Sequence, residues 1–149
     1  MSKVLGMDCK AYHSSTAFDG ATNDAAAATW NEMTEVRDVT VTLSNVEIDV
    51  SDRSSTYKLY RAGQHDISVN VTQLWNTSDT YFALVLDAWE GRSSITLAFM
   101  DGDESVAGKE GPASNWVVLD FERGEDLDGA AISTYSVKPH SYPEWYISA

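Results

Sequence analysis

The chain has 149 residues, a length that suits one domain with a real hydrophobic core rather than two. Its 23 acidic and 10 basic residues give a formal net charge of −13, which argues against a protein that grips nucleic acid, because phosphate binding needs clustered Lys and Arg. The single cysteine excludes an intrachain disulfide, and without a signal-peptide core or an apolar run of about 20 residues we expect a soluble protein, with no membrane partner, made in a reducing compartment.

The first part of the chain combines strand patterns with one long polar segment. Residues 3–12 predict a first strand that Gly6 weakens in its middle. Residues 14–29 are rich in Ser, Thr, Gly, Asn and Ala and predict a long loop. Residues 30–33 predict a short strand.

Residues 38–50 form the longest alternating segment. Apolar side chains occupy odd positions up to Leu43 and even positions from Val46 onward. A slip of one residue turns every following side chain to the opposite face, so a bulge or a tight turn is needed near Ser44 and Asn45. We favour the bulge, because these two residues lack the glycine of the strongest hairpin turns.

The polar segment at residues 51–63 holds three of the ten basic residues and is longer than a hairpin needs. Loops of this length inside compact domains are usually functional or mobile. The residues alone leave a mobile loop and a partner contact equally open.

A strand–helix–strand pattern covers residues 66–103. The helix is expected at about residues 78–90, with Ser78 or Thr77 as its cap and Asp79 in the first turn, next to the positive end of the helix dipole. Its apolar face is wide, which indicates cover on more than one side, by the core or by another subunit. The candidate packing or interface residues are Tyr81, Phe82, Val85, Leu86 and Trp89.

Two more strands are expected near the end of the chain, at residues 116–122 and 131–138, joined by a turn at 124–129. We expect Pro139 and Pro143 to end regular structure and to leave an aromatic tail. In the first of these strands the acidic side chains Asp120 and Glu122 face one way. The apolar set expected on the other face is Val117, Leu119 and Phe121.

The motifs of catalysis and metal binding are missing from the sequence. The three histidines are scattered without zinc spacing, and Asp101-Gly-Asp103 begins like a calcium loop but lacks its later glycine and glutamate. No nucleophile elbow, phosphate-binding loop or dinucleotide fingerprint occurs. We therefore predict no catalytic residue, no metal site, no cofactor and no enzymatic activity.

One alternative from another functional class rests on the tryptophans. An exposed pair could form a stacking platform on a β-sandwich, as in a carbohydrate-binding or capsid-decoration module, although packing roles are the simpler reading. The five are Trp30, Trp75, Trp89, Trp116 and Trp145.

Taken from end to end, the chain resembles phage major tail proteins, which form the tail tube. The likeness is distributed in the order of elements rather than held in one sharp motif. The segments that carry it are VLGMDCKAY at 4–12, EVRDVTVTL at 35–43, EIDVSDR at 47–53, the strand–helix–strand of 66–103, residues 116–125 and VKP at 137–139.

This resemblance implies a mainly β domain over residues 1–149. Two packed antiparallel sheets would form a β-barrel-like sandwich with the helix on its flank, similar to the tube proteins of type VI secretion systems. Family members form hexameric rings that stack into a hollow tube for DNA. The implied partners are further copies and other tail proteins, such as tape measure, sheath or terminator. The implied location is the virion tail, after assembly in the cytoplasm of the host bacterium.

The resemblance also implies roles for particular residues. The hairpin at 38–74 and the strand pair at 116–138 would line the tube, where negative charge would repel passing DNA. The candidate lumen-facing residues are Thr40, Thr42, Glu47, Asp49, Ser68, Asn70, Thr72, Asp120 and Glu122. The loop at 51–63 would reach a neighbouring subunit or ring through Arg53, Tyr57, Lys58, Tyr60 and Arg61.

Overall fold

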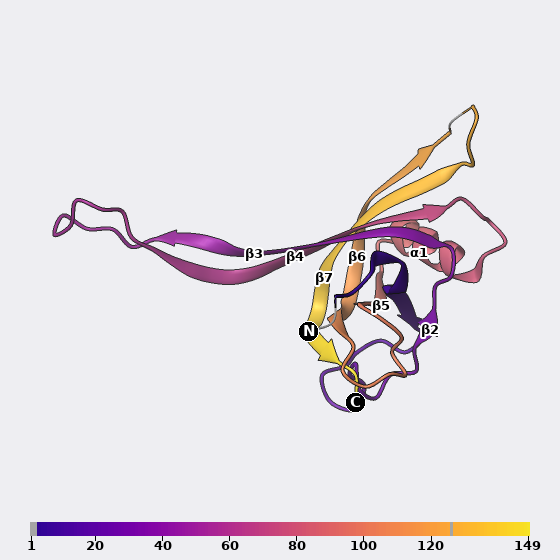
Figure 1. The fold of residues 1–149 in the computed structure, drawn as a ribbon, viewed down its shortest axis with the longest axis horizontal. Helices are drawn as coiled ribbons and strands as arrows, with labels where there is room; N and C mark the ends of the chain where they lie inside the picture. Colours follow the sequence, from indigo (N-terminus) through magenta and orange to yellow (C-terminus); the bar gives the residue numbers. More distant parts are fainter. Residues whose placement is uncertain (1–2, 126) are drawn as a thin grey trace.

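The structure is a computed structural model that describes residues 3–125 and 127–149. Over these residues the chain forms seven strands, one α-helix and one short 3-10 helix (Figure 1). The 3-10 helix is Gly6–Asp8, and the other elements are β1 (Lys10–Ser14), β2 (Asn31–Glu32), β3 (Val36–Asp49), β4 (Tyr60–Leu74), α1 (Thr80–Gly91), β5 (Ser94–Met100), β6 (Glu110–Gly124) and β7 (Ile132–Ile147). The expectation of a mainly β chain with a single flanking helix is confirmed.

All strands belong to one antiparallel sheet in the order β2-β1-β5-β6-β7-β4-β3. The two packed sheets that the resemblance implies are one continuous sheet, joined through β6 and β7, and this sheet does not close into a barrel. Three register shifts between β6 and β7 interrupt regular pairing, and such bulges bend a sheet. One core cluster therefore contains Ala11 of β1, Leu97 of β5 and Val69 of β4, from opposite ends of the strand order.

The main core lies between the curved sheet and α1. Trp116, Phe82 and Tyr135 are fully buried there, and the indole Nε1 of Trp116 donates a hydrogen bond of 2.8 Å to the carbonyl oxygen of Leu97. Phe121 stacks on Tyr135 with ring centroids 5.5 Å apart. Because each large ring is covered and the buried indole N–H is paired, this part of the molecule has what a stable core requires.

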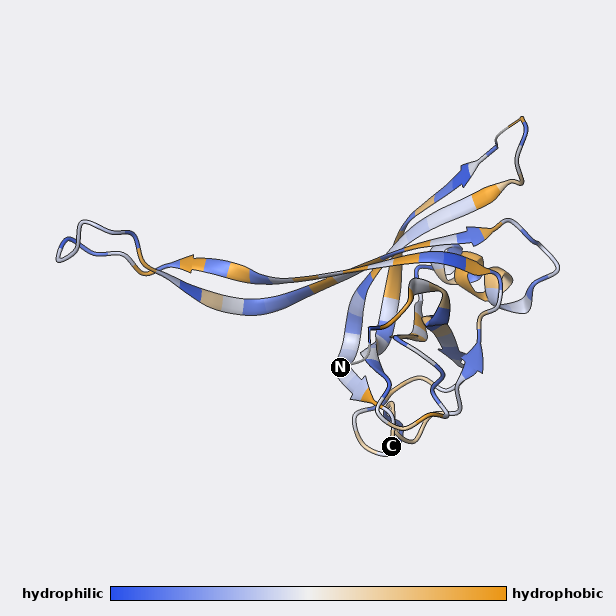
Figure 2. Ribbon diagram, viewed as in Figure 1, coloured by the Kyte–Doolittle hydropathy of each residue, from blue (hydrophilic) through white to orange (hydrophobic). Residues whose placement is uncertain are grey.

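The β3–β4 hairpin extends far beyond this core (Figure 1). β4 pairs with β7 only from Val69 to Leu74, so residues 44–66, called here the hairpin arm, are paired only within the hairpin. Apolar and polar residues mix along the arm (Figure 2), and all of its residues except Gly63 are exposed. One ion pair at its base, from Asp66 to Lys138, joins it to β7. A protruding ribbon of this kind has little stability of its own in water.

A bulge occurs at the predicted place in this hairpin, but its extra residue lies on β4, so β3 keeps its alternation and its change of apolar phase is not absorbed. Between Asn45 and Glu47 β3 advances by two residues, while β4 advances by three, from His65 to Ala62. A Cβ atom on Gly63 would lie 3.0 Å from the carbonyl oxygen of Val46, so the close approach at the bulge favours glycine.

The strand predicted at residues 3–12 is wrong in its first part. β1 begins at Lys10, where pairing with Met100 of β5 starts, and the 3-10 helix precedes it. Val4, Leu5 and Met7 are exposed, because β5 ends at Met100 and offers them no partner strand. An apolar pattern without a neighbouring strand was not enough to make a strand here.

Residues 15–30 contain turns and bends but no helix or strand, and Asn115 holds this segment to the body. The buried Asn115 Oδ1 accepts hydrogen bonds from the Phe18 amide at 3.0 Å and the Thr96 hydroxyl at 2.7 Å. Its Nδ2 donates to the Phe18 carbonyl at 3.0 Å and to Ser141 Oγ at 2.9 Å. One side chain thus satisfies both backbone groups of Phe18, whose ring packs against Trp30.

The helix forms where its periodicity predicts, but its cap is Asp79 rather than Ser78 or Thr77. The Asp79 carboxylate accepts a hydrogen bond of 3.1 Å from the Phe82 amide, which is the N-cap arrangement. Its last residue is Gly91, and Arg92 takes the left-handed conformation that closes the final turn.

The last strand is longer than predicted, because Pro139 and Pro143 do not end it. β7 runs to Ile147, and Trp116 of β6 still lies opposite Pro139. The pairing around these prolines is irregular, with two register shifts between Ala113 and Trp116, and irregular ladders are where strands tolerate proline. Within the turn predicted at 124–129, Asp126 lies outside the described residues.

Candidate functional site

Four long strands, β3, β4, β7 and β6, lie side by side and form what we call the four-strand layer. Its registers align side chains in rows across all four strands. Val39, Val71, Tyr135 and Phe121 form one such row, and these side chains belong to the face that α1 and the core cover.

The neighbouring rows are polar and belong to the opposite face, called here the polar face. One row is Thr40, Asn70, Ser136 and Asp120. The next row is Asp38, Thr72, Thr134 and Glu122. Successive side chains of a strand point to opposite faces, so one layer separates a packed apolar core from a surface open to water.

The polar face carries more negative than positive charge. Asp38, Asp120 and Glu122 lie on it without a cationic partner among the described residues, while Asp66 is 3.5 Å from the Nζ of Lys138. The Ser136 hydroxyl donates a hydrogen bond of 3.1 Å to the Asp120 carboxylate. Such a face repels polyanions and offers them no cluster of basic side chains.

Both sides of the four-strand layer end in unpaired strand edges within the described residues. β3 is the last strand of the sheet along its whole length. On the other side, β5 pairs with β6 only as far as Val117, so β6 has a free edge from Val118 to Gly124. Long free edges offer backbone donors and acceptors to another strand.

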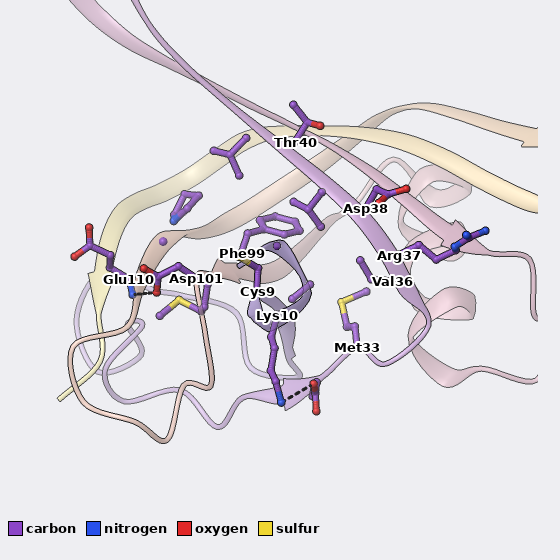
Figure 3. A pocket seen from close by; sticks show the side chains of 18 of the residues that line it. Cys9, Lys10, Met33, Val36, Arg37, Asp38, Thr40, Phe99, Asp101 and Glu110 are labelled. Atoms are coloured by element: carbon purple, nitrogen blue, oxygen red, sulfur yellow. Dashed lines mark hydrogen bonds and ion pairs between the residues drawn. The ribbon is translucent and has the colours of Figure 1, made fainter. Parts of the chain in front are cut away.

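A broad groove of about 1230 Å³ runs beneath β3 and is called here the β3 groove (Figure 3). Val39, Leu43 and Met7 line it, although all three are exposed. Figure 3 shows Arg37 and Asp38 on its β3 side and Asp101 with Glu110 on the far side. Burial and the nearby Asp101 raise the pKa of the Cys9 thiol at the groove, so this cysteine is less ready to ionise than a free one.

A second, smaller groove of about 510 Å³ lies at the end of α1, beside the free edge of β6. Trp89, Glu90 and Arg92 line one side of this helix-end groove, and Val117 to Leu119 line the other. The apolar side chains stay in contact with water, since Trp89 is 45% exposed and Leu119 is 50% exposed.

Val117 and Leu119 were expected on the apolar face together with Phe121, and both expectations are wrong. Val117 lies opposite Lys138, on the polar face. Val118 and Asp120 lie opposite the consecutive residues Val137 and Ser136, so Leu119 is the extra residue of a bulge. Val118 takes the buried position, and Leu119 turns to the solvent. The bulge keeps Asp120 and Glu122 on the polar face.

Solved structures similar to this chain include parts of a gene transfer agent particle, a phage tail tube and a prophage baseplate. No protein-family model matches the sequence, and no curated protein matches it. A subunit in the virion of a gene transfer agent aligns with a TM-score of 0.70 at 10% identity, over 95% of this chain and 98% of that one. The SPP1 tail tube aligns with a TM-score of 0.69 at 13% identity, over 99% of this chain and 77% of that one. A chain of the anti-feeding prophage baseplate gives 0.60 at 10% identity, over 98% and 97%.

The chain has the phage tail tube protein fold. A further structure with this fold is the tail of an empty gene transfer agent particle with C6 symmetry, which aligns with a TM-score of 0.68 at 12% identity over 95% of this chain and 98% of that one.

The tail tube fold brings most of the lumen candidates together. Seven of them lie on the polar face, namely Thr40, Thr42, Ser68, Asn70, Thr72, Asp120 and Glu122. Glu47 and Asp49 lie apart from these, on the hairpin arm beyond the bulge. The sequence could not separate the two groups, because the extent of pairing between β4 and β7 is a tertiary property.

The arm candidates divide between a loop and a strand. Arg53, Tyr57 and Lys58 lie in the loop between β3 and β4, whereas Tyr60 and Arg61 begin β4, so the loop is shorter than the predicted 51–63. Tyr57 is 79% exposed, and local bonds such as that from the Ser54 amide to Asp52 shape the loop. The loop therefore carries exposed aromatic and basic side chains at the far end of the arm.

The helix candidates also divide. Phe82 and Val85 are buried and belong to the core, and Tyr81 and Leu86 are half-buried. Trp89 is left for the helix-end groove. Most of the wide apolar face of the helix is therefore covered by the core, and among these candidates only Trp89, at the end of the helix, is left exposed for an interface.

The tryptophans do not gather into one platform. Trp116 is fully buried, while the exposed Trp89 and Trp145 line different grooves. Across residues 3–125 and 127–149, no group of three or more His, Cys, Asp or Glu is placed to hold a metal ion. In the same part of the chain, no helix is both long and apolar enough to cross a membrane.

Proposed function

We propose that this chain is a structural subunit of a phage-like tail tube, in which six copies form a ring and stacked rings enclose a channel for DNA. The observation that carries the proposal is the four-strand layer. It has a solvated polar face, a covered apolar face and a free edge on each side.

The free edges support ring formation. In an isolated chain the edge of β3 and the edge of β6 from Val118 to Gly124 have no partner strand. Long unpaired edges of this kind invite aggregation. If β3 of one copy pairs with β6 of the next, both edges are satisfied and the layers join into a closed wall. A closed ring with one repeated head-to-tail contact is a common way to build an oligomer.

The polar face supports the lumen role. In this arrangement Asp38, Asp120 and Glu122 of every copy line the channel beside Thr and Asn side chains. Repulsion between these carboxylates and phosphates keeps DNA from adhering to the wall.

The hairpin arm supports contact between rings. Its loop presents Arg53 and Lys58 and its second strand Arg61, whereas the whole chain has a net charge of −13. The arm as a whole holds four acidic and three basic side chains, but its loop at 50–59 has Arg53 and Lys58 against Asp52 alone. This loop thus offers basic and apolar side chains to an acidic neighbour. The proposed location is the virion tail after assembly in the host cytoplasm. The proposed partners are further copies, a tape measure protein and a sheath or terminator protein, and no enzymatic activity is expected.

Electron microscopy of the purified chain over a range of concentrations tests the proposal. Rings with six-fold symmetry or hollow tubes are the expected result. A chain that stays a compact monomer at high concentration, with a rigid arm, contradicts it.

The lumen role has a separate test. The double substitution Asp120→Lys and Glu122→Lys is expected to leave assembly intact and to make the tubes retain DNA, since it reverses the charge of the polar face. The matched control is Asp87→Lys with Asp128→Lys, two exposed acidic side chains on α1 and in the β6–β7 turn. Equal DNA retention by both variants contradicts a lumen position for Asp120 and Glu122.

A further inference from the structure

The β3 groove and the helix-end groove lie beside the two free edges of the sheet, and their lining side chains match in polarity and in charge. The following inference rests on the proposed ring. We infer that the helix-end groove of one copy lies against the β3 groove of the next, so that the side chains lining the two grooves pack together. Trp89 and Leu119 then contact Val39 and Leu43 of a second copy.

The position follows from the continuity of sheet faces. When two edge strands pair, the side chains of each face continue across the junction. Val39 and Leu43 lie on the core-side face of β3, in register with the core residues Val71 and Ile67. The helix α1 covers the core-side face of β6. Pairing of β3 with β6 therefore brings the end of one copy's helix against the β3 groove of the other.

The apolar surfaces on the two sides match. Leu43 is 57% exposed, and Trp89 and Leu119 are each about half exposed. Large side chains left half-covered at two facing grooves are the pattern that a protein interface covers on assembly.

The charges also match. Arg37 lines the β3 groove, and Glu90 lies beside Trp89 on the helix end. In the described part of the chain neither side chain has an ion-pair partner. A contact that places the guanidinium near the carboxylate stabilises the pair and gives the docking one orientation. These observations favour a second copy over an unrelated partner, because both halves of the contact are on this chain.

Assembly measured by sedimentation against concentration tests the apolar contact. We expect Leu119→Ser and Trp89→Ala each to raise the concentration needed for assembly by about tenfold or more. The matched control is Leu127→Ser, which changes a fully exposed leucine of the β6–β7 turn outside both grooves. Circular dichroism checks that each variant keeps the fold, which is expected because the replaced side chains are exposed.

The charge contact has its own test. Arg37→Glu is expected to weaken assembly, and the second change Glu90→Arg is expected to restore it. Assembly that neither single change weakens overturns the Arg37–Glu90 contact.

Crosslinking tests the position directly, because the sole cysteine, Cys9, lines the β3 groove. In assembled Glu90→Cys protein, a short bismaleimide reagent is expected to join Cys9 of one copy to the new cysteine of the next. The Cys9→Ser, Glu90→Cys double variant is expected to give no such product.

Normal assembly of Leu119→Ser and Trp89→Ala together with absence of the crosslink overturns the docking while tubes still form, which leaves the proposed function standing. A wild-type chain that forms neither rings nor tubes overturns both.

Discussion

The body of the molecule and the hairpin arm are built from the same alternating strand pattern, but only the body has a second layer to cover its apolar face. Trp116 of β6 is fully buried, whereas Ile48 of β3 is 46% exposed although its neighbours alternate just as regularly. The difference lies in what packs against the strand. Alternation makes a ribbon with two unlike faces, and burial depends on a partner that lies elsewhere in the chain or in another copy.

The largest expected effect contrasts one residue of each region. Trp116→Ala removes a fully buried ring and its hydrogen bond to Leu97, and should lower the free energy of unfolding by about 4 kcal/mol. Ile48→Ala on the arm should lower it by less than about 1 kcal/mol, because that side chain is already in water. Urea denaturation of the monomer measures both. Similar losses would mean that the arm belongs to the cooperative core.

The next effect concerns the way the body holds its long polar segment. Asn115→Ala leaves both backbone groups of Phe18 unpaired and should cost about 3 kcal/mol. Proteolysis within residues 14–29 should then become faster than in the wild type. Asn45→Ala is the matched control, because Asn45 Oδ1 contacts only the exposed His65 ring and its loss should cost little. A proteolysis pattern unchanged by Asn115→Ala would show that Phe18 and Trp30 hold the segment alone.

An intermediate effect appears at alkaline pH. Burial raises the pKa of Tyr135 above its ordinary value of 10.0, and burial with the hydrogen bond to Glu104 raises that of Tyr146 to about 12. An acid whose pKa is raised by folding contributes stability that is complete below about pH 10 and is lost as the pH rises further.

The variant Tyr135→Phe separates this contribution. It should cost about 1 kcal/mol at neutral pH, through loss of the hydrogen bond to Gln73 Oε1, and should flatten the decline above pH 10. Unfolding curves at neutral and alkaline pH measure the two effects. An alkaline slope equal to that of the wild type would count against Tyr135 as its source.

The smallest effect on the body is expected from cutting the arm. Trypsin should cleave at Arg53 or Lys58 in the exposed loop while the unfolding free energy of the body changes by less than about 1 kcal/mol. In assembled tubes the same sites should be protected. Equal cleavage in both states would place the loop outside every contact between copies.

Much of the fold could be predicted from local patterns. The helix at 80–91 and the long strands follow from hydrophobic period. The change of phase near Asn45 marked the place of an irregular pairing, but not that the extra residue belongs to β4. These signals are readable because each depends on a few neighbouring residues.

Apart from the helix cap, which is Asp79 rather than Ser78 or Thr77, the errors concern partners distant in sequence. The strand expected from residue 3 failed for want of a neighbour, and β7 continues through Pro139 and Pro143 because its pairing with β6 tolerates an irregular register. Leu119 was assigned to the wrong face, since a bulge is set by the residues opposite it rather than by the strand that contains it. No local signal could have predicted the hydrogen bonds between Asn115 and Phe18, because the two residues lie 97 positions apart in the sequence.

The sequence by itself determined the class of the molecule: a mainly β, acidic chain with one helix and with polar residues alternating along its strands. Side-chain alternation and net charge need no knowledge of the third dimension. Only the tertiary structure decided which strands lie side by side, and hence that Asp120 shares a face with Thr40 while Glu47 does not. It also decided that β3 and the end of β6 from Val118 to Gly124 are free edges, with a groove beside each. Strand order and register follow from the packing of the whole chain, because every pairing competes for the same core.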